Sequence, residues 1–141
     1  MMFDLKSVLI PGMNFAIERM LDESDTAAHY GSSKLGHLIA SPVYVGIMID
    51  SAVKTVEDRL PEGLVSVGRS MTFTHDAPTS LGMNLRMTAT LKDIVGDRLY
   101  FDITAYDDCG EIGHGTHERV VVHKEALFKR ANQRLLHTTT P

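Results

Sequence analysis

The sequence predicts an α+β fold in which an antiparallel sheet wraps around one long central helix. Two patterns support this prediction: an apolar segment with helical periodicity near residues 41–60, and strand-like segments after it in which apolar and polar residues alternate. An antiparallel sheet with one polar face can cover a helix with its apolar face. The chain has 141 residues, the usual size of one domain, so we expect a single domain over residues 1–141.

The composition restricts the classes of function. The formal net charge is -4 and the sequence has no long basic run, which argues against nucleic acid as a partner. Cys109 is the only cysteine, so an intramolecular disulfide and a metal site built on cysteines are excluded, and we expect a reducing cytoplasm. No stretch approaches the ~20 apolar residues that a membrane-spanning helix needs, so we expect no membrane partner.

The N-terminal segments have the weakest patterns. We expect residues 1–14 to form a loosely held lead-in. Residues 15–21, "FAIERML", are compatible with a first strand or with a short helix. Residues 22–36 are polar and small, which is typical of a loop or a short helical excursion.

The next segment has the signals of a long helix. Ser41 stands where an N-cap belongs, and Pro42 stands at the first helical position. Pro61 and Gly63 end the segment. Because apolar residues occupy most of its sides, we expect the helix to be buried. One stripe of the helix consists of Val45, Ile49, Ala52, Val53 and Val56.

An antiparallel meander is predicted after the helix, because the following segments have strand periodicity and short turns between them. Arg69 interrupts the apolar face of the first segment. We expect that face to consist of Val65, Val67, Met71 and Phe73. Residues 124–141 are expected to form a C-terminal helix or a tail. Strands are predicted for residues 64–75, 82–95, 98–107 and 112–123.

Three segments carry a resemblance to a known family: "ASPVYVGIMIDSA", "TFTHDAPTSLGM" and "GEIGHGTHERVVV". Over about residues 15–130 the chain resembles the fluoroacetyl-CoA thioesterase family of hotdog proteins. The resemblance implies the hotdog fold and hydrolysis of a small or medium acyl-CoA thioester. It implies no cofactor, since coenzyme A is part of the substrate. It also implies a homodimer or a dimer of dimers with sites at the subunit interface.

The resemblance also implies a set of catalytic residues. Family members use a hydroxyl at the start of the helix, a carboxylate within the helix and a histidine at the end of the following strand. Ser41 and His75 match the hydroxyl and the histidine. Ile49 stands where the family has glutamate, so Asp50, one residue later, is the candidate carboxylate.

Asp50 also has a simpler interpretation. Lys54 lies four residues later, so the two side chains are spaced for an ordinary helix ion pair. A shift of one residue rotates a side chain by ~100° around a helix, so a catalytic Asp50 requires a distorted helix or a site in the partner subunit. Asp76 is another possible base.

The segment "GHGTHER" near the C-terminus supplies further candidates. Glycine in a strand often marks a close approach, here of a neighbouring backbone or of the bound acyl group. His114 and His117 are an odd number of residues apart and point to opposite faces of a strand, so we expect no metal site. Arg119 is compatible with a contact to a CoA phosphate or with a solvated strand face. The expected substrate-binding residues are Pro42, Gly46, Gly115 and Arg119.

Two other functions compete with thioester hydrolysis. Ile49 at the family's glutamate position favours a non-catalytic acyl-CoA binding protein. An enoyl-CoA hydratase on the same fold is disfavoured, because the sequence lacks the Asp-x-Asn-Pro-x-His pattern of such enzymes.

Overall fold

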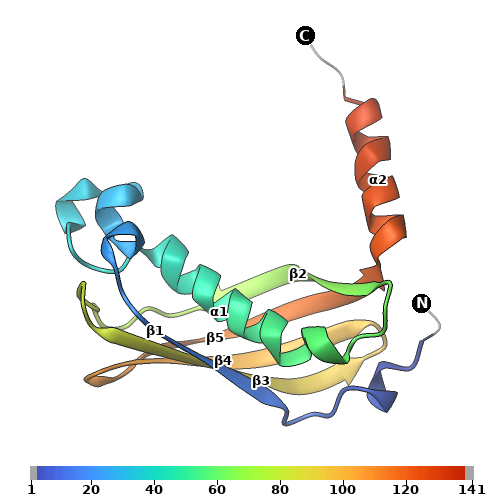
Figure 1. Ribbon diagram of the computed structural model, residues 1–141, viewed down its shortest axis with the longest axis horizontal. Coiled ribbons are helices and arrows are strands. Elements are labelled where there is room, and N and C mark those ends of the chain that lie inside the picture. Colours follow the sequence, from blue (N-terminus) through green and yellow to red (C-terminus); the bar gives the residue numbers. More distant parts are fainter. Residues whose placement is uncertain (1–2, 139–141) are drawn as a thin grey trace.

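The structure, a computed structural model, describes residues 3–138 of the chain. Five strands form one antiparallel sheet in the order β1-β3-β4-β5-β2, and the helix α1 (Ser41–Val56) crosses one face of it (Figure 1). This is the predicted arrangement of one sheet around one helix. The strands are β1 Asn14–Met20, β2 Leu64–Phe73, β3 Asn84–Val95, β4 Arg98–Asp107 and β5 Gly110–His123.

The N-terminal segment is held more firmly than the sequence predicts. Leu5 and Leu9 are each only 1% exposed and belong to the hydrophobic core. The amide of Gly12 donates to the carbonyl of Leu91 at 2.7 Å, which fastens the segment to β3. The expectation of a loose lead-in is therefore wrong for residues 3–14, because two leucines in it fill the end of the core. Of the alternatives for residues 15–21, the strand is confirmed.

Residues 22–40 form the helical excursion rather than a plain loop. It contains three short 3-10 helices, Glu23–Asp25, Ala27–His29 and Ser33–Leu35. The amide of Ile39 donates to the carbonyl of Thr79 at 2.8 Å, so the end of this segment is tied to the chain that follows β2. That tie fixes the place where α1 begins.

The helix α1 buries a different face from the predicted stripe. Ala52 and Val56 are buried, but Val45, Ile49 and Val53 are only half-buried. The helix packs mainly against β3 and β1, so one of its sides stays uncovered within the described residues. We call this side the open flank of α1; it consists of Pro42, Val45, Gly46, Ile49 and Val53. The buried face consists of Tyr44, Ile47, Met48, Ser51, Ala52, Thr55 and Val56.

A bulge in β2 changes which of its residues face the helix. The register against β5 shifts between Gly68 and Ser70, so Arg69 is the extra residue. After a bulge the alternation of side chains is reversed. Val65 and Val67 therefore lie on the opposite face from Met71 and Phe73, and the predicted single face is wrong. In β3 and β4 the predicted alternation is confirmed, with Leu85, Met87, Ala89, Leu91, Leu99, Phe101, Ile103 and Ala105 all buried.

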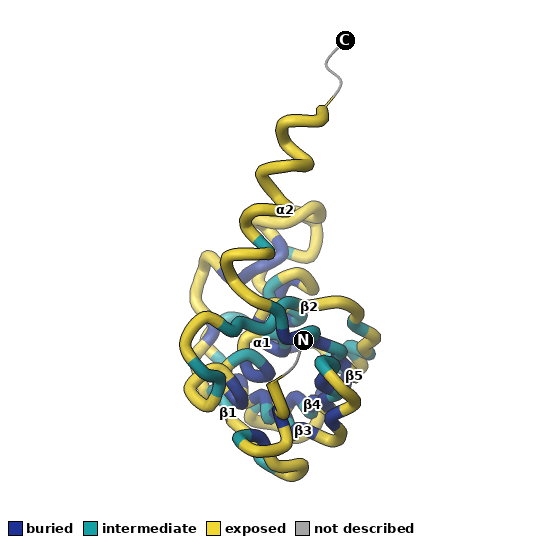
Figure 2. Tube along the Cα trace, turned by 90° about the vertical axis from the view of Figure 1, so that its right-hand side faces the viewer, coloured by how far each residue is buried: buried dark blue, intermediate teal, exposed yellow. Residues whose placement is uncertain are grey.

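The chain continues past β5 as the helix α2 (Lys124–Leu136), so the helix of the two C-terminal alternatives is confirmed. It projects from the body of the molecule and is exposed along almost its whole length (Figures 1 and 2). Neither α1 nor α2, nor any shorter helix between residues 3 and 138, is long and apolar enough to cross a membrane.

Candidate active site

Two of the three predicted catalytic residues meet at the start of α1. Ser41 and His75 line one open pocket of about 280 Å³, and Asp76 lies beside them in its wall. The short helices of residues 22–40 cover one side of the pocket and the chain after β2 forms the other. The remaining wall is apolar and consists of Leu35, Leu38, Ile39, Ala77 and Pro78.

Ser41 is not the N-cap of α1, contrary to the sequence prediction. Ala40 has the extended backbone of a cap residue, with φ -76° and ψ 137°, and its amide donates to the carbonyl of Asp25 at 2.9 Å. Ser41 is the first helical residue and Pro42 the second, and among the described residues no side chain caps this helix. The Ser41 hydroxyl is therefore not used by the helix. The first amides of a helix also lack partners within it and form its positive end, which faces the pocket here.

The ring of His75 is held by Tyr44. The two rings stack with centroids 4.2 Å apart and planes 10° apart. The Tyr44 hydroxyl donates to the carbonyl of Thr74 at 2.7 Å, directly before His75. Burial, together with the negative charges of Asp76 and Glu111, raises the pKa of Tyr44 to about 12, so the hydroxyl keeps its proton. A fully buried side chain thus fixes both the ring and the backbone of the candidate base.

One ring nitrogen of His75 is left available. Within residues 3–138, Nε2 of His75 is the one buried side-chain nitrogen or oxygen without a hydrogen-bond partner. Buried polar atoms are nearly always satisfied, so such an atom requires an explanation, and a reacting group is one. Burial lowers the pKa of His75, and the nearby charge of Asp76 opposes this shift. The imidazole is therefore neutral near pH 7 and able to accept a proton.

Asp76 is the carboxylate that the structure brings to this pocket. Its carboxylate accepts a hydrogen bond from the Thr74 hydroxyl at 2.9 Å, and its amide donates to the carbonyl of Ile112 at 2.7 Å. The sequence offered Asp76 only as an alternative base. The sequence signal for Asp76 was its position directly after His75. Beyond the end of a strand, neighbouring side chains need not point to opposite faces, so both residues can line the same pocket.

Two glycines of β5 allow the close approach that the sequence predicts. A Cβ on Gly113 would lie 2.2 Å from the Tyr44 hydroxyl and 2.3 Å from the carbonyl of Thr74. A Cβ on Gly115 would lie 2.9 Å from the carbonyl of Thr72. The neighbouring backbone is thus the group that comes close. Gly113 is needed because the hydrogen bond that positions His75 passes directly over it.

Asp50 lies away from the pocket of Ser41 and His75. Its carboxylate pairs with Lys54 at 2.7 Å, and about half of each side chain is exposed. This confirms the helix ion pair of the simpler interpretation, while a catalytic role of Asp50 stays a prediction. Pro42 and Gly46 lie on the open flank of α1.

Arg119 belongs to a buried network instead of a solvated strand face, and that part of the prediction is wrong. Its side chain is 5% exposed. The guanidinium donates through Nε to the Ser66 hydroxyl and through Nη2 to the Ser66 carbonyl, each at 2.8 Å. A third donor, Nη1, lies 3.1 Å from Nε2 of His117, whose Nδ1 donates to the carbonyl of Ser70 at 2.8 Å. All three of these contacts are inside the protein, so the position of Arg119 does not support a contact with a CoA phosphate.

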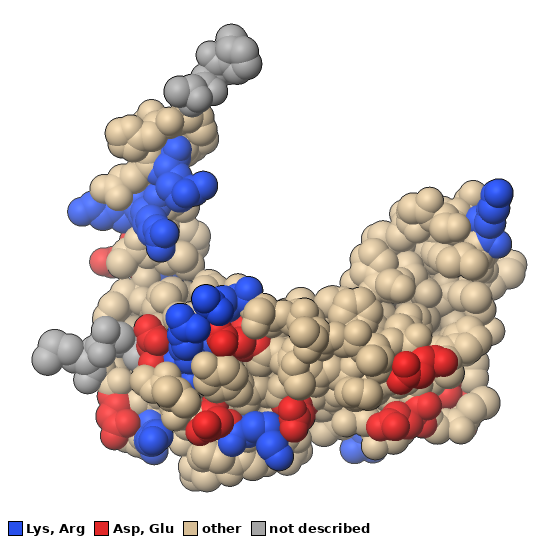
Figure 3. All heavy atoms as spheres, turned by 180° about the vertical axis from the view of Figure 1, so that it is seen from behind, with Lys and Arg blue, Asp and Glu red and all other residues tan. Residues whose placement is uncertain are grey.

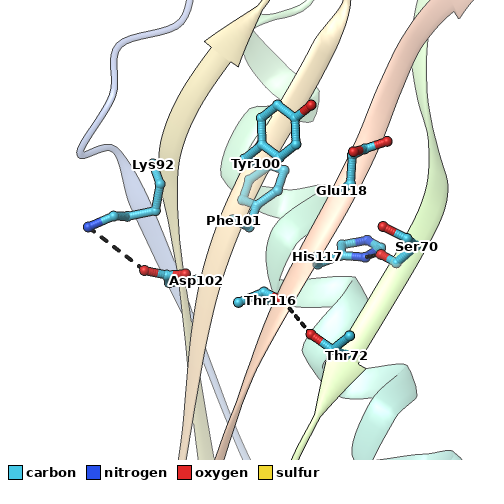
Figure 4. Close-up of a pocket in the computed structure, with 9 residues that line it drawn as sticks. All are labelled: Ser70, Thr72, Lys92, Tyr100, Phe101, Asp102, Thr116, His117 and Glu118. Atoms are coloured by element: carbon cyan, nitrogen blue, oxygen red, sulfur yellow. Dashed lines mark hydrogen bonds and ion pairs between the residues drawn. The ribbon is translucent and has the colours of Figure 1, made fainter.

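A second hollow lies on the outer face of the sheet, and it contains none of the predicted catalytic residues. It has a volume of about 270 Å³ and is lined mainly by polar side chains of β2, β4 and β5 (Figure 4). In it the hydroxyls of Thr72 and Thr116 are hydrogen-bonded, and Lys92 lies 3.8 Å from Asp102. The side chains in the hollow bond to one another, which is typical of a polar sheet surface.

Comparisons with known sequences point to one family. Residues 21–125 match the family model described as fluoroacetyl-CoA-specific thioesterase. The fluoroacetyl-CoA thioesterase of Streptantibioticus cattleyicolor is 35% identical over 97 residues, which span 69% of this chain and 70% of that protein.

Solved structures agree with this assignment. A hot-dog-like protein from Thermanaerovibrio acidaminovorans has a TM-score of 0.88 at 28% identity, over 98% of this chain and 100% of that one. A variant of the fluoroacetyl-CoA-specific protein FlK in complex with acetyl-CoA has a TM-score of 0.84 at 31% identity, over 89% of this chain and 98% of that one. The predicted hotdog fold is confirmed, and the chain belongs to the fluoroacetyl-CoA-specific thioesterase family.

Proposed function

We propose that the protein hydrolyses the thioester of a small or medium acyl-CoA. Membership of a thioesterase family supports thioester hydrolysis. The observation that carries the proposal for this site is the unpartnered Nε2 of His75, in the pocket that also holds Ser41 and the start of α1.

The pocket offers the groups that the reaction needs. Neutral His75 takes a proton from water as the water oxygen attacks the thioester carbonyl. The negative charge on the carbonyl oxygen is stabilised by the free amides and the positive end of α1. When the intermediate collapses, the carbon–sulfur bond breaks and the proton on His75 passes to the leaving thiolate. Ser41 orients the water, and the charge of Asp76 favours the protonated imidazole that forms in between.

We also propose that the protein acts as a homodimer or a dimer of dimers. In the described sheet β2 is an edge strand, and an unpaired edge is usually covered or paired. The open flank of α1 is apolar and uncovered as well. Antiparallel pairing of β2 with β2 of a second copy would satisfy the edge and bring two α1 helices together. A stable monomer at micromolar concentration in light scattering would contradict this part of the proposal.

A reducing cytoplasm is the proposed location. Cys109 is exposed and free, and it is the only cysteine of the chain. A disulfide-free chain with an exposed thiol suits a reducing compartment.

The alternative is a protein that binds acyl-CoA without hydrolysing it. Ile49 favours this alternative, because it occupies the position at which the resembling family has a glutamate and cannot move a proton. The two functions differ in one measurement. Purified protein is incubated with a panel of acyl-CoA thioesters of increasing chain length, and the release of free thiol is followed. Thiol release by wild type but not by His75→Ala is expected, whereas binding without any release would favour the alternative.

A further inference from the structure

Unpaired positive charge is concentrated on α2. Six of the 14 Lys and Arg side chains form ion pairs within residues 3–138. Half of the others lie on this one helix, which has a single acidic residue, Glu125. Figure 3 shows Lys and Arg atoms gathered along the helix where it rises from the body. The four basic residues are Lys124, Lys129, Arg130 and Arg134.

The helix also exposes apolar side chains beside this charge. Phe128 and Leu135 are 55% and 69% exposed, and Nζ of Lys124 lies 6.0 Å from the centre of the Phe128 ring. At ~100° per residue, Phe128 and Leu135 fall on one side of the helix, whereas Arg130 and Arg134 share the opposite side, one turn apart. Two guanidinium groups one turn apart on the same side of a helix suit a ligand that carries more than one phosphate group.

Within one protomer α2 stands far from the catalytic pocket. The amide of Lys124 donates to the carbonyl of Gly63 at 2.9 Å, so α2 begins beside the start of β2. His75 follows the other end of β2, and a strand of 10 residues is about 33 Å long. In Figure 3, α2 rises at one end of the molecule, the opposite end rises as well, and the surface between them is hollowed.

The proposed dimer removes this separation. Antiparallel pairing of β2 with its copy places the start of one β2 beside the end of the other. The helix α2 of one subunit then stands beside the pocket of its partner. The match to the Thermanaerovibrio acidaminovorans structure covers 98% of this chain, which includes α2, so the projecting helix is not peculiar to this chain.

We propose that α2 of one subunit binds the phosphates of the CoA whose thioester lies in the pocket of the other. Arg130 and Arg134, which share one side of the helix, pair with the phosphate groups. This inference rests on the proposed function and dimer, because it assigns the two ends of one substrate to two subunits. It explains why a chain of net charge -4 keeps four cations on an otherwise unattached helix.

The first test separates phosphate binding from catalysis. Arg130→Glu/Arg134→Glu is compared with Lys129→Glu, which reverses charge on another side of the same helix. Each is assayed with the acyl-CoA that wild type hydrolyses best and with the same acyl group on pantetheine, which lacks the nucleotide. Loss of two exposed charge pairs should raise KM for the acyl-CoA roughly tenfold. The double variant should keep the wild-type kcat and the wild-type KM for acyl-pantetheine, and Lys129→Glu should resemble wild type with both substrates.

The second test asks which subunit supplies the helix. Mixed dimers are prepared from His75→Ala chains and Arg130→Glu/Arg134→Glu chains. If α2 serves the partner, the intact pocket in a mixed dimer lies beside an intact α2, and the wild-type KM returns. If α2 serves its own pocket, KM stays high, and the proposal is overturned.

The outcomes also distinguish this inference from the proposed function. Absence of thiol release from every acyl-CoA by wild type would reject the hydrolase function itself. Hydrolysis with equal KM values for wild type and the double variant would reject only the role of α2. Equal losses on acyl-CoA and acyl-pantetheine would also overturn it, because the effect would then not involve phosphates. Salt should raise KM for acyl-CoA in wild type more than in the double variant.

Discussion

His75 and His117 lie in similar surroundings but have opposite hydrogen-bond states. His117 lies in β5 opposite β2, His75 lies two residues beyond the end of β2, and burial lowers the pKa of each. His117 uses both ring nitrogens, one toward the Ser70 carbonyl and one toward Arg119. His75 has a buried Nε2 with no partner among residues 3–138. His117 therefore completes a hydrogen-bond network with Ser70 and Arg119, whereas His75 is held in place by Tyr44 and keeps one ring nitrogen free.

The difference indicates that burial alone does not identify a catalytic histidine. A buried ring with both nitrogens bonded contributes to stability and has no atom free for a substrate. A ring that is held by stacking, with one nitrogen unsatisfied, is ready for proton transfer at little cost in reorganisation. The two histidines also differ in the residue that supports them. Tyr44 stacks on the ring of His75 and leaves its Nε2 free, whereas Arg119 is hydrogen-bonded to Nε2 of His117.

The largest effect is expected for His75→Ala. Thiol release should fall by ~100- to 10,000-fold, because a general acid–base group is lost. The unfolding free energy should fall by only about 1 kcal/mol, because the stacking on Tyr44 is lost but Nε2 has no hydrogen bond to lose. A variant that keeps more than half of the wild-type rate would remove His75 from the mechanism.

His117→Ala should show the opposite pattern. The Ser70 carbonyl and Nη1 of Arg119 would both lose a partner inside the protein, which costs about 1–3 kcal/mol of unfolding free energy. Turnover per folded molecule should remain near that of wild type. Urea unfolding together with the thiol-release assay checks both statements. A variant as stable as wild type but inactive would mean that the two histidines have been assigned the wrong roles.

Much of this contrast could not be predicted from the sequence. The strand pattern and the position of His75 after it were visible, and both Gly113 and Gly115 were predicted to allow a close approach. The state of His117 depends on the bulge at Arg69, because the ring donates to the carbonyl of Ser70, directly after the bulge. The sequence analysis treated Arg69 as a polar exception on an otherwise continuous apolar face. A bulge at Arg69, which moves the following residues to the other face, gives the same sequence pattern, so the pattern could not distinguish the two.

Other errors came from treating a segment by itself. Ser41 has the composition and position of an N-cap, but Ala40 takes that place because its amide is bonded to the distant Asp25. The lead-in has no regular periodicity and is broken by Pro11, yet Leu5 and Leu9 reach the core. Tertiary contacts decided these positions, so no local signal in the sequence reveals them.

The pH dependence should separate activity from stability. Neutral His75 is the active form, so kcat/KM should fall on acidification through the pKa of this residue, which lies below its usual 6.5. For stability, the unfolded chain binds protons on both histidines more readily than the folded protein does. The unfolding free energy should therefore be fully present above about pH 6.5 and decrease as the pH falls through the lowered pKa values.

The variant His117→Ala tests the source of this pH effect. It should reduce the decrease in stability below pH 6.5, because one of the two groups with a lowered pKa is gone. The acid limb of kcat/KM should stay where it is. A shift in the pH at which kcat/KM falls would mean that His117 takes part in the reaction, and the separate roles assigned to the two histidines would be wrong.

A smaller effect is expected for Tyr44→Phe. The phenyl ring keeps the stacking on His75, but the carbonyl of Thr74 loses its donor, so about 1 kcal/mol of unfolding free energy should be lost. A modest fall in kcat with unchanged KM is expected, because His75 becomes less well fixed. Tyr106→Phe is the control, since Tyr106 is 40% exposed on the outer face of the sheet. Equal effects of both variants on kcat would argue against positioning by Tyr44.

The smallest effect is expected for Asp50→Asn, and it decides the question of the catalytic carboxylate. In the protomer Asp50 pairs with Lys54 at the surface, so loss of the charge should cost about 0.3–0.5 kcal/mol and leave turnover near wild type. Asp76→Asn should instead lower kcat, because Asp76 lines the pocket and its charge favours the protonated form of His75. Asp50 follows Ile49 and borders the open flank of α1, however, and in the proposed dimer that flank faces the second copy. Loss of most activity in Asp50→Asn with unchanged stability would therefore assign Asp50 to the pocket of the partner subunit. Asp76 would then not be the catalytic carboxylate.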